Sequence, residues 1–101
     1  MSEEPVIRGV TVRGRVQGVG FRMWTEREAR ARRLEGWVRN RRDGSVEAVF
    51  AGPAAAVDAM LEACWRGPPG ARVNAVDVVE AQAHELAARS PGETFSQLPT
   101  V

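Results

Sequence analysis

A glycine-rich loop that leads into a predicted helix is the segment best suited to binding an anion. The run Gly14-Arg15-Val16-Gln17-Gly18-Val19-Gly20 follows a predicted strand, and the predicted helix begins at Phe21. Such a loop leaves unpaired backbone N–H groups that point to one place, where the helix dipole favours negative charge. We predict a phosphate-binding loop made of Gln17, Gly18, Val19, Gly20 and Phe21. The glycines could also serve only the geometry of a tight turn.

Arg22 follows this loop, in the first turn of the predicted helix. A cation there faces the positive end of the helix dipole, which costs about 0.3–1 kcal/mol unless an anion lies between the two. A guanidinium can donate two parallel hydrogen bonds to phosphate oxygens, a geometry that Lys cannot match. We predict that Arg22 binds phosphate. The alternative is a solvated surface arginine, since all fourteen cationic side chains of this chain are Arg.

Asn40 ends a predicted strand, just before an Asp43-Gly44 turn. A neutral amide both accepts and donates hydrogen bonds, so it can orient a water molecule beside a phosphate dianion without repelling the dianion. A carboxylate at this position would repel it. Asn is also common beside hairpin turns, so from the residues alone both interpretations stay open.

The sequence contains too few Cys and His residues for several common kinds of site. Cys64 is the only cysteine, which excludes an internal disulfide and a cysteine-rich metal site. His84 is the only histidine, which argues against a zinc site or a histidine-based triad. We expect no metal and no cofactor, and we expect Cys64 to be a small core residue.

The elements that must position Arg22 and Asn40 follow from the hydrophobic pattern. Alternation predicts strands at 6–14, 36–40, 46–50 and 73–82, with a hairpin between the second and the third. Helical spacing predicts helices over 21–34 and between Pro53 and Gly67. Residues 94–98 could add a short edge strand after an irregular loop over 87–93. We predict an α+β, ferredoxin-like two-layer sandwich of order βαββαβ, with an antiparallel sheet and two helices on one face.

Length and composition indicate a single globular domain over residues 1–101, with its core at about 6–98. No apolar run approaches the ~20 residues of a membrane span. The start, Met1-Ser2-Glu3-Glu4-Pro5, is acidic where a secretory signal would be basic. We expect a cytoplasmic monomer that does not bind membranes.

Three strings of this sequence closely resemble the acylphosphatase family: Gly14 to Arg22, Gly36-Trp37-Val38-Arg39-Asn40 and Asp43-Gly44-Ser45-Val46-Glu47. The resemblance spans about residues 6–98. It implies hydrolysis of an acyl phosphate to carboxylate and phosphate by in-line attack of water, without a metal or a covalent intermediate. It also implies that residues 17–21 bind phosphate, that Arg22 is essential for substrate binding and that Asn40 orients the catalytic water. Trp24, where relatives commonly have Tyr, and the Ala-rich segment 81–89 depart from the family pattern.

Two rival functions fit the sequence less well. Residues 1–50 carry eleven Arg against seven acids, as a nucleic-acid-binding domain could, but the chain has no Tyr and lacks the aromatic strand signature that stacks bases. We expect no nucleic-acid partner. The chain is also similar to the first domain of large carbamoyl-transferring hydrogenase maturation proteins, whose zinc-finger cysteines and further domains are absent here. We expect a free-standing enzyme that acts on a small acyl phosphate.

Overall fold

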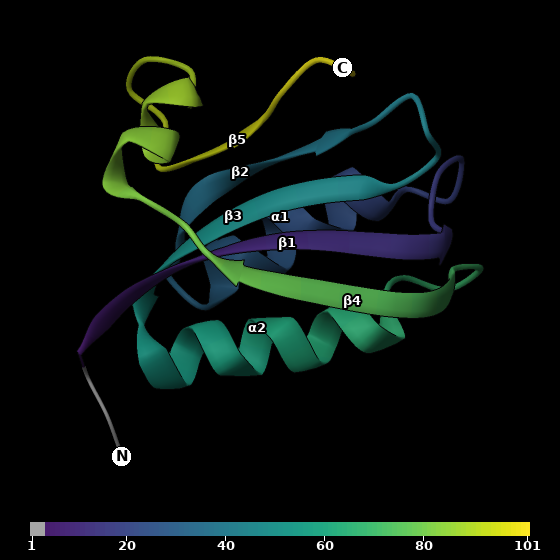
Figure 1. The fold of residues 1–101 in the computed structure, drawn as a ribbon, viewed down its shortest axis with the longest axis horizontal. Helices are drawn as coiled ribbons and strands as arrows, with labels where there is room; N and C mark the ends of the chain where they lie inside the picture. Colours follow the sequence, from purple (N-terminus) through teal and green to yellow (C-terminus); the bar gives the residue numbers. More distant parts are fainter. Residues whose placement is uncertain (1–3) are drawn as a thin grey trace.

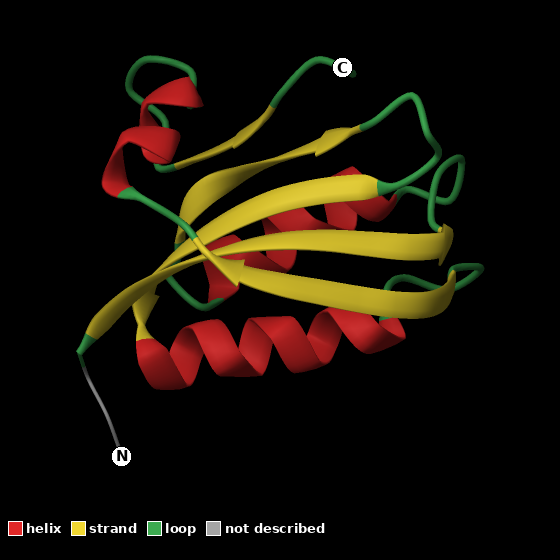
Figure 2. Ribbon diagram, viewed as in Figure 1, coloured by secondary structure: helices red, strands yellow, loops and turns green. Residues whose placement is uncertain are grey.

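Five strands form one sheet, and two α-helices cover one of its faces (Figure 1; Figure 2). The computed structural model describes residues 4–101, so the first three residues of the acidic start lie outside the described part. The elements are β1 (Pro5–Arg15), α1 (Phe21–Ala31), β2 (Glu35–Asn40), β3 (Val46–Pro53), α2 (Ala54–Arg66), β4 (Arg72–Glu80), the 3-10 helix η1 (Ala83–Ala88) and β5 (Phe95–Gln97). This order confirms the predicted α+β, ferredoxin-like sandwich.

The strands lie in the order β4-β1-β3-β2-β5. Strands β1 to β4 pair antiparallel, as predicted. The short edge strand β5 instead runs parallel to β2, with Phe95 opposite Gly36, so the complete sheet is mixed and not purely antiparallel. The direction differs because the chain leaves β4, crosses one end of the sheet through η1 and turns back before it enters β5 (Figure 1).

The 3-10 helix η1 lies just after the predicted end of the fourth strand at residue 82 and extends into the predicted irregular loop over 87–93. It begins with a capping box, in which the backbone N–H of Gln82 donates to Glu85 Oε2 at 2.8 Å. Trp37 Nε1 donates to the backbone oxygen of Glu85, also at 2.8 Å. This bond fixes η1 against β2, and so it sets the place from which the chain returns toward β5.

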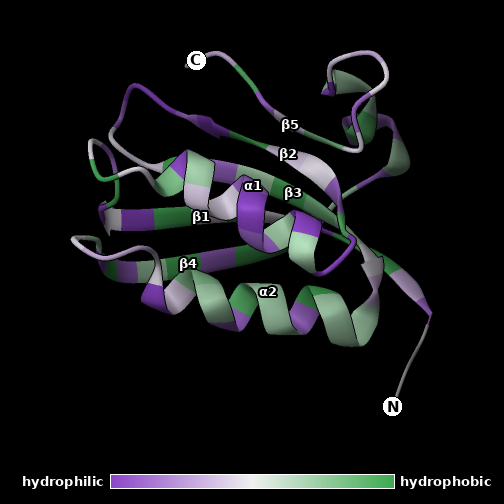
Figure 3. Ribbon diagram, turned by 180° about the vertical axis from the view of Figure 1, so that it is seen from behind, coloured by the Kyte–Doolittle hydropathy of each residue, from purple (hydrophilic) through white to green (hydrophobic). Residues whose placement is uncertain are grey.

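The hydrophobic core lies between the sheet and the helices. From α2 it takes residues at helical spacing, which are Val57, Met60, Ala63 and Cys64. Burial raises the pKa of the Cys64 thiol to about 12, so the thiol stays protonated at neutral pH and behaves as the core residue that was predicted. Trp24 of α1 is buried as well, and Figure 3 shows both hydrophilic and hydrophobic residues along this helix. No helix among residues 4–101 is long and apolar enough to cross a membrane.

Gly36, in the strand that ends at Asn40, lets β2 approach β3 closely. Its φ is +144°, and a Cβ added there would lie 1.7 Å from the backbone oxygen of Val49. Gly36→Ala is therefore expected to lower the free energy of unfolding by at least about 2 kcal/mol, because backbone strain and a backbone clash act together. Denaturant unfolding measures this loss.

Gly44→Ala is the matched control for that prediction. Gly44 also has a positive φ, +94°, but no atom lies within 4 Å of an added Cβ. The control should therefore show only the conformational cost of about 1–2 kcal/mol. Equal losses in the two variants would contradict a cost for the contact with Val49.

Candidate active site

A cavity of about 180 Å³ opens between the loop after β1, the start of α1 and the end of β2. Six of the seven predicted site residues line it, namely Gln17, Gly18, Gly20, Phe21, Arg22 and Asn40. The seventh, Val19, is half-buried and packs against the hydrophobic core. Residues that are well separated in the sequence therefore meet around one cavity.

The loop over 17–21 keeps its backbone donors free. Gly18 and Gly20 have φ values of +75° and +77°, the left-handed conformation for which glycine was expected there. In the described chain, no backbone N–H of residues 17–21 donates to another protein group. Gly20 is the N-cap of α1, and the first turn of that helix contains no acidic residue. Free N–H groups at an uncompensated helix N-terminus favour the binding of an anion.

Arg22 brings an unengaged guanidinium to this cavity. Among residues 4–101, no protein group accepts a hydrogen bond from its side chain or forms an ion pair with it. Arg30, on the same helix, is engaged by contrast: its Nε lies 2.8 Å from Glu26 Oε2 and its Nη2 lies 2.7 Å from the backbone oxygen of Phe95. The donors of Arg22 are therefore available for a phosphate group.

Asn40 combines a fixed backbone with a free side chain. Its position in β2 is set by pairing with Val46 of β3 on one side and, on the other, by a 3.2 Å hydrogen bond from the N–H of Val101 to its backbone oxygen. Its side-chain amide has no protein partner within the described residues. The amide can therefore both accept from and donate to a water molecule in the cavity.

The electrostatics of the cavity are simple. Arg22 is the only ionisable side chain among the cavity-lining residues of the described chain. The lining residue Gln97 is bonded to a carboxylate: its Nε2 donates to Glu26 Oε1 at 2.8 Å. Hydrogen bonds from Gln97 and then from Arg30 lower the pKa of Glu26, which keeps this carboxyl ionised and engaged with the protein. No lining side chain is a strong base, so the cavity is suited to holding an anion and a water molecule.

Three lining residues were not predicted as part of the site, namely Val16, Met23 and Gln97. Met23 follows Arg22 directly and is 65% exposed, an unusual fraction for a large apolar side chain. Its position next to Arg22 in the sequence is the signal from which Met23 could have been predicted to line the cavity. Gln97 could not have been found in this way, because it reaches the cavity only through the parallel pairing of β5 with β2.

Comparison with known proteins agrees with this geometry. The family model described as Acylphosphatase matches residues 8–90. An acylphosphatase of Nitrobacter hamburgensis is 58% identical over 98 residues, which cover 97% of this chain and 99% of the relative. The structure of an acylphosphatase from Coxiella burnetii has a TM-score of 0.81 at 33% identity and covers 93% of each chain. That from Bacillus subtilis has a TM-score of 0.80 at 38% identity and covers 92% of this chain and 98% of the other. Since the matched residues include both the loop and Asn40, and the folds superpose over nearly their whole length, this chain belongs to the acylphosphatase family.

Proposed function

We propose that this chain hydrolyses the carboxyl–phosphate bond of acyl phosphates in the cavity described above, with Arg22 and Asn40 as its catalytic residues. One observation carries the assignment. Two side chains with no protein partner in the described chain, one cationic and one neutral, line the same cavity beside a loop with free backbone N–H groups. A cationic side chain can bind the phosphoryl oxygens, and a neutral amide beside it can orient water without repelling the phosphate dianion.

The phosphoryl group lies against the loop. The N–H groups of residues 17–21 and the N-terminus of α1 bind its oxygens, and Arg22 donates two parallel hydrogen bonds. During transfer, negative charge spreads over the three equatorial oxygens and toward the leaving group. Donors that are already oriented stabilise this charge without reorganisation, which is the main catalytic contribution available to such a site.

Asn40 holds the attacking water. Its side-chain oxygen accepts a hydrogen bond from the water, and its neutrality avoids repulsion of the phosphate dianion. The water oxygen forms a bond to phosphorus in line with the leaving carboxylate, and the phosphorus–oxygen bond to the acyl group breaks. A phosphoryl oxygen of the substrate takes the proton, since no lining side chain of the described residues is a base. The products are a carboxylate and inorganic phosphate.

We further propose that residues 1–101 act as one acylphosphatase domain and as a cytoplasmic monomer. Its substrates are acyl phosphates, and the candidates are the small molecules carbamoyl phosphate and acetyl phosphate and phosphorylated carboxylates of proteins. The cavity is lined by no His, Cys, Asp or Glu of the described chain, so it lacks the usual ligands of a catalytic metal. The mechanism accordingly assigns no step to a metal ion.

Hydrolysis of benzoyl phosphate is expected to continue at an unchanged rate in excess chelator. The physical reason is that Arg22 and the loop N–H groups provide the positive potential that a metal ion would otherwise supply. Phosphate release is measured with and without chelator, with Asn40→Ala as the paired control for a contaminating phosphatase. Loss of activity in chelator that is restored by an added divalent ion would contradict the mechanism.

A further inference from the structure

We propose that Gln17 is a positioning residue, which ties the phosphate-binding loop to the β2–β3 turn and so fixes the distance between bound phosphate and the water held by Asn40. This inference rests on the proposed roles of Arg22 and Asn40 and adds a residue that acts through them. It concerns the side chain of Gln17, whereas the phosphate contacts assigned to the loop come from its backbone.

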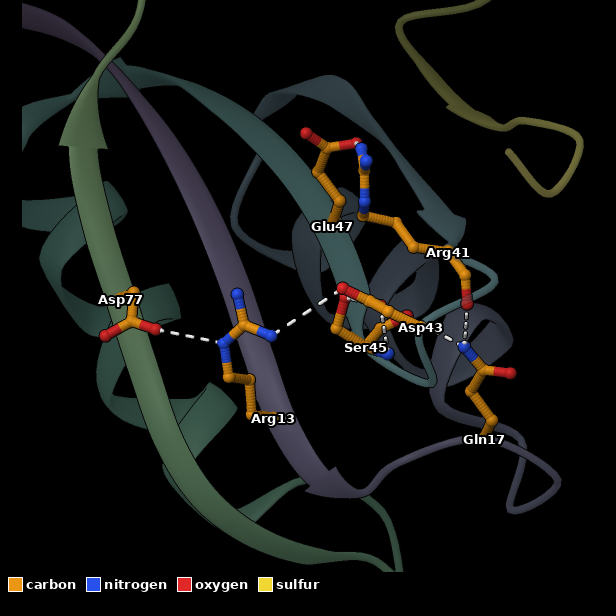
Figure 4. Close-up of polar contacts among 7 residues, drawn as sticks. All are labelled: Arg13, Gln17, Arg41, Asp43, Ser45, Glu47 and Asp77. Carbon is orange, nitrogen blue, oxygen red and sulfur yellow. Dashed lines mark hydrogen bonds and ion pairs between the residues drawn. The ribbon is translucent and has the colours of Figure 1, made fainter.

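Gln17 spans the gap between the loop and the turn with both hydrogens of its amide. Its Nε2 donates to the backbone oxygen of Arg41 at 2.7 Å and to that of Ser45 at 2.8 Å (Figure 4). A primary amide nitrogen has two donors, so both are used. In Figure 4 the amide oxygen of Gln17 points away from these two carbonyl groups.

The two acceptors lie at the neck of the hairpin, next to Asn40. The N–H of Arg41 donates to the backbone oxygen of Ser45 at 2.9 Å, and the N–H of Gly44 donates to the backbone oxygen of Arg41 at 3.1 Å. Arg41 follows Asn40 directly in the chain. Gln17 therefore donates to the residue that directly follows Asn40, whose side chain is proposed to hold the water.

The loop has no other polar attachment near this point. Within residues 4–101, the backbone of residues 17–19 makes no hydrogen bond to the protein. Apolar packing of Val16 and Val19 holds the loop against the core, but apolar contacts are non-directional. The directional restraint between loop and turn is thus the side chain of Gln17. Without it, the loop N–H groups can still bind phosphate, but the position of the loop relative to Asn40 is no longer fixed.

The turn, in contrast, is braced independently of Gln17. Asp43 Oδ1 accepts from the hydroxyl of Ser45 at 2.6 Å and from its N–H at 2.9 Å. These bonds from Ser45 lower the pKa of Asp43, which keeps the carboxylate ionised at neutral pH. Arg13 lies 3.7 Å from Asp43 and 3.4 Å from Asp77, which extends the bracing to β1 and β4 (Figure 4). Replacement of Gln17 should therefore leave the turn and Asn40 in place and free only the loop.

Gln17→Met tests the inference because it keeps the length of the side chain and removes both donors. We expect kcat for benzoyl phosphate to fall roughly 10- to 100-fold, since a displacement of about 1 Å between reacting groups can cost 10²-fold. KM and the inhibition constant of inorganic phosphate should stay within about threefold, because Arg22 and the loop N–H groups remain. Gln82→Met is the matched control: it removes the capping-box amide of η1, outside the cavity, and should leave kcat unchanged.

Gln17→Met in the background of Asn40→Ala separates positioning from a general structural effect. If Gln17 acts through Asn40, its replacement should cost less than about twofold when the water-holding amide is already gone. An equal loss of kcat in both backgrounds, or a weakened inhibition by phosphate at unchanged kcat, would overturn the inference while Arg22 and Asn40 keep their roles. Full activity of Asn40→Ala alone would instead refute the proposed function. Thermal unfolding of each variant checks that the chain is folded at the assay temperature.

Discussion

Arg22→Ala is expected to lower kcat/KM for benzoyl phosphate by at least about 10²–10³-fold, the usual cost of losing one preorganised donor to a transition state. The guanidinium has no protein partner in the described chain, so its removal breaks no internal hydrogen bond or ion pair and should leave the free energy of unfolding nearly unchanged. Removing a cation from the first turn of α1 also relieves its repulsion with the helix dipole. Activity and stability should therefore move independently, which steady-state kinetics and denaturant unfolding can both measure.

Two further variants identify the cause of that loss. Arg22→Lys keeps the positive charge but not the bidentate fork, so it should stay severely impaired if geometry matters as much as charge. Arg27→Ala removes a cation from the exposed surface of the same helix, away from the cavity, and should keep nearly full activity. Near-native activity of Arg22→Lys, or a comparable loss in Arg27→Ala, would show that only the overall positive potential of this region is required.

Local patterns were sufficient to predict most of the fold. Helical spacing between Pro53 and Gly67 predicted α2, and the Asp43-Gly44 pair predicted the hairpin that follows Asn40. These signals depend on residues that are close together in the sequence. The residues that face the core recur with the period of the helix or strand that carries them, so the sequence pattern reveals both. Helix and strand boundaries moved by a few residues, as at the end of α1, where Arg32 is the C-cap in place of a helix continuing to 34.

The parts that local patterns did not predict depend on contacts between distant segments. The parallel direction of β5 follows from the path of η1, which is held by the bond between Trp37 and Glu85. The same pairing brings Gln97 to the cavity, where it binds Glu26. No periodicity within residues 81–98 encodes either contact, because both depend on which edge of the sheet the chain reaches.

The candidate site was open to two interpretations at the sequence level for a similar reason. A solvated surface arginine and a phosphate-binding one have the same sequence context, and they differ in whether the side chain lies at a cavity that can hold the anion. Arg22 lines such a cavity without a partner in the described chain, which supports the phosphate-binding interpretation, whereas Arg30 is engaged by protein groups. The bond of Gln17 to the turn is equally invisible in the sequence, since it joins residues 24 and 28 positions apart.

Asn40→Asp is the second replacement with a large expected effect, and it tests why the water-holding group is neutral. The carboxylate is nearly isosteric with the amide, so the cavity and the pairing of β2 with β3 should persist. The change removes the N–H donors and places a negative charge near the phosphate dianion. We expect kcat/KM to fall by at least about 10²–10³-fold, as in Asn40→Ala. In steady-state assays, inhibition by inorganic phosphate should also become weaker than in the Ala variant.

The Ala and Asp variants of Asn40 should differ in the kinetic parameters that they change. Loss of the amide alone should remove the proposed water ligand and lower kcat, while the loop and Arg22 are still expected to bind phosphate. Repulsion by a carboxylate acts on phosphate already in the ground state, so it should appear in KM and in the phosphate inhibition constant. Near-native turnover by Asn40→Asp would mean that a carboxylate can serve as the base for the attacking water, and that neutrality at this position is not a requirement of the reaction.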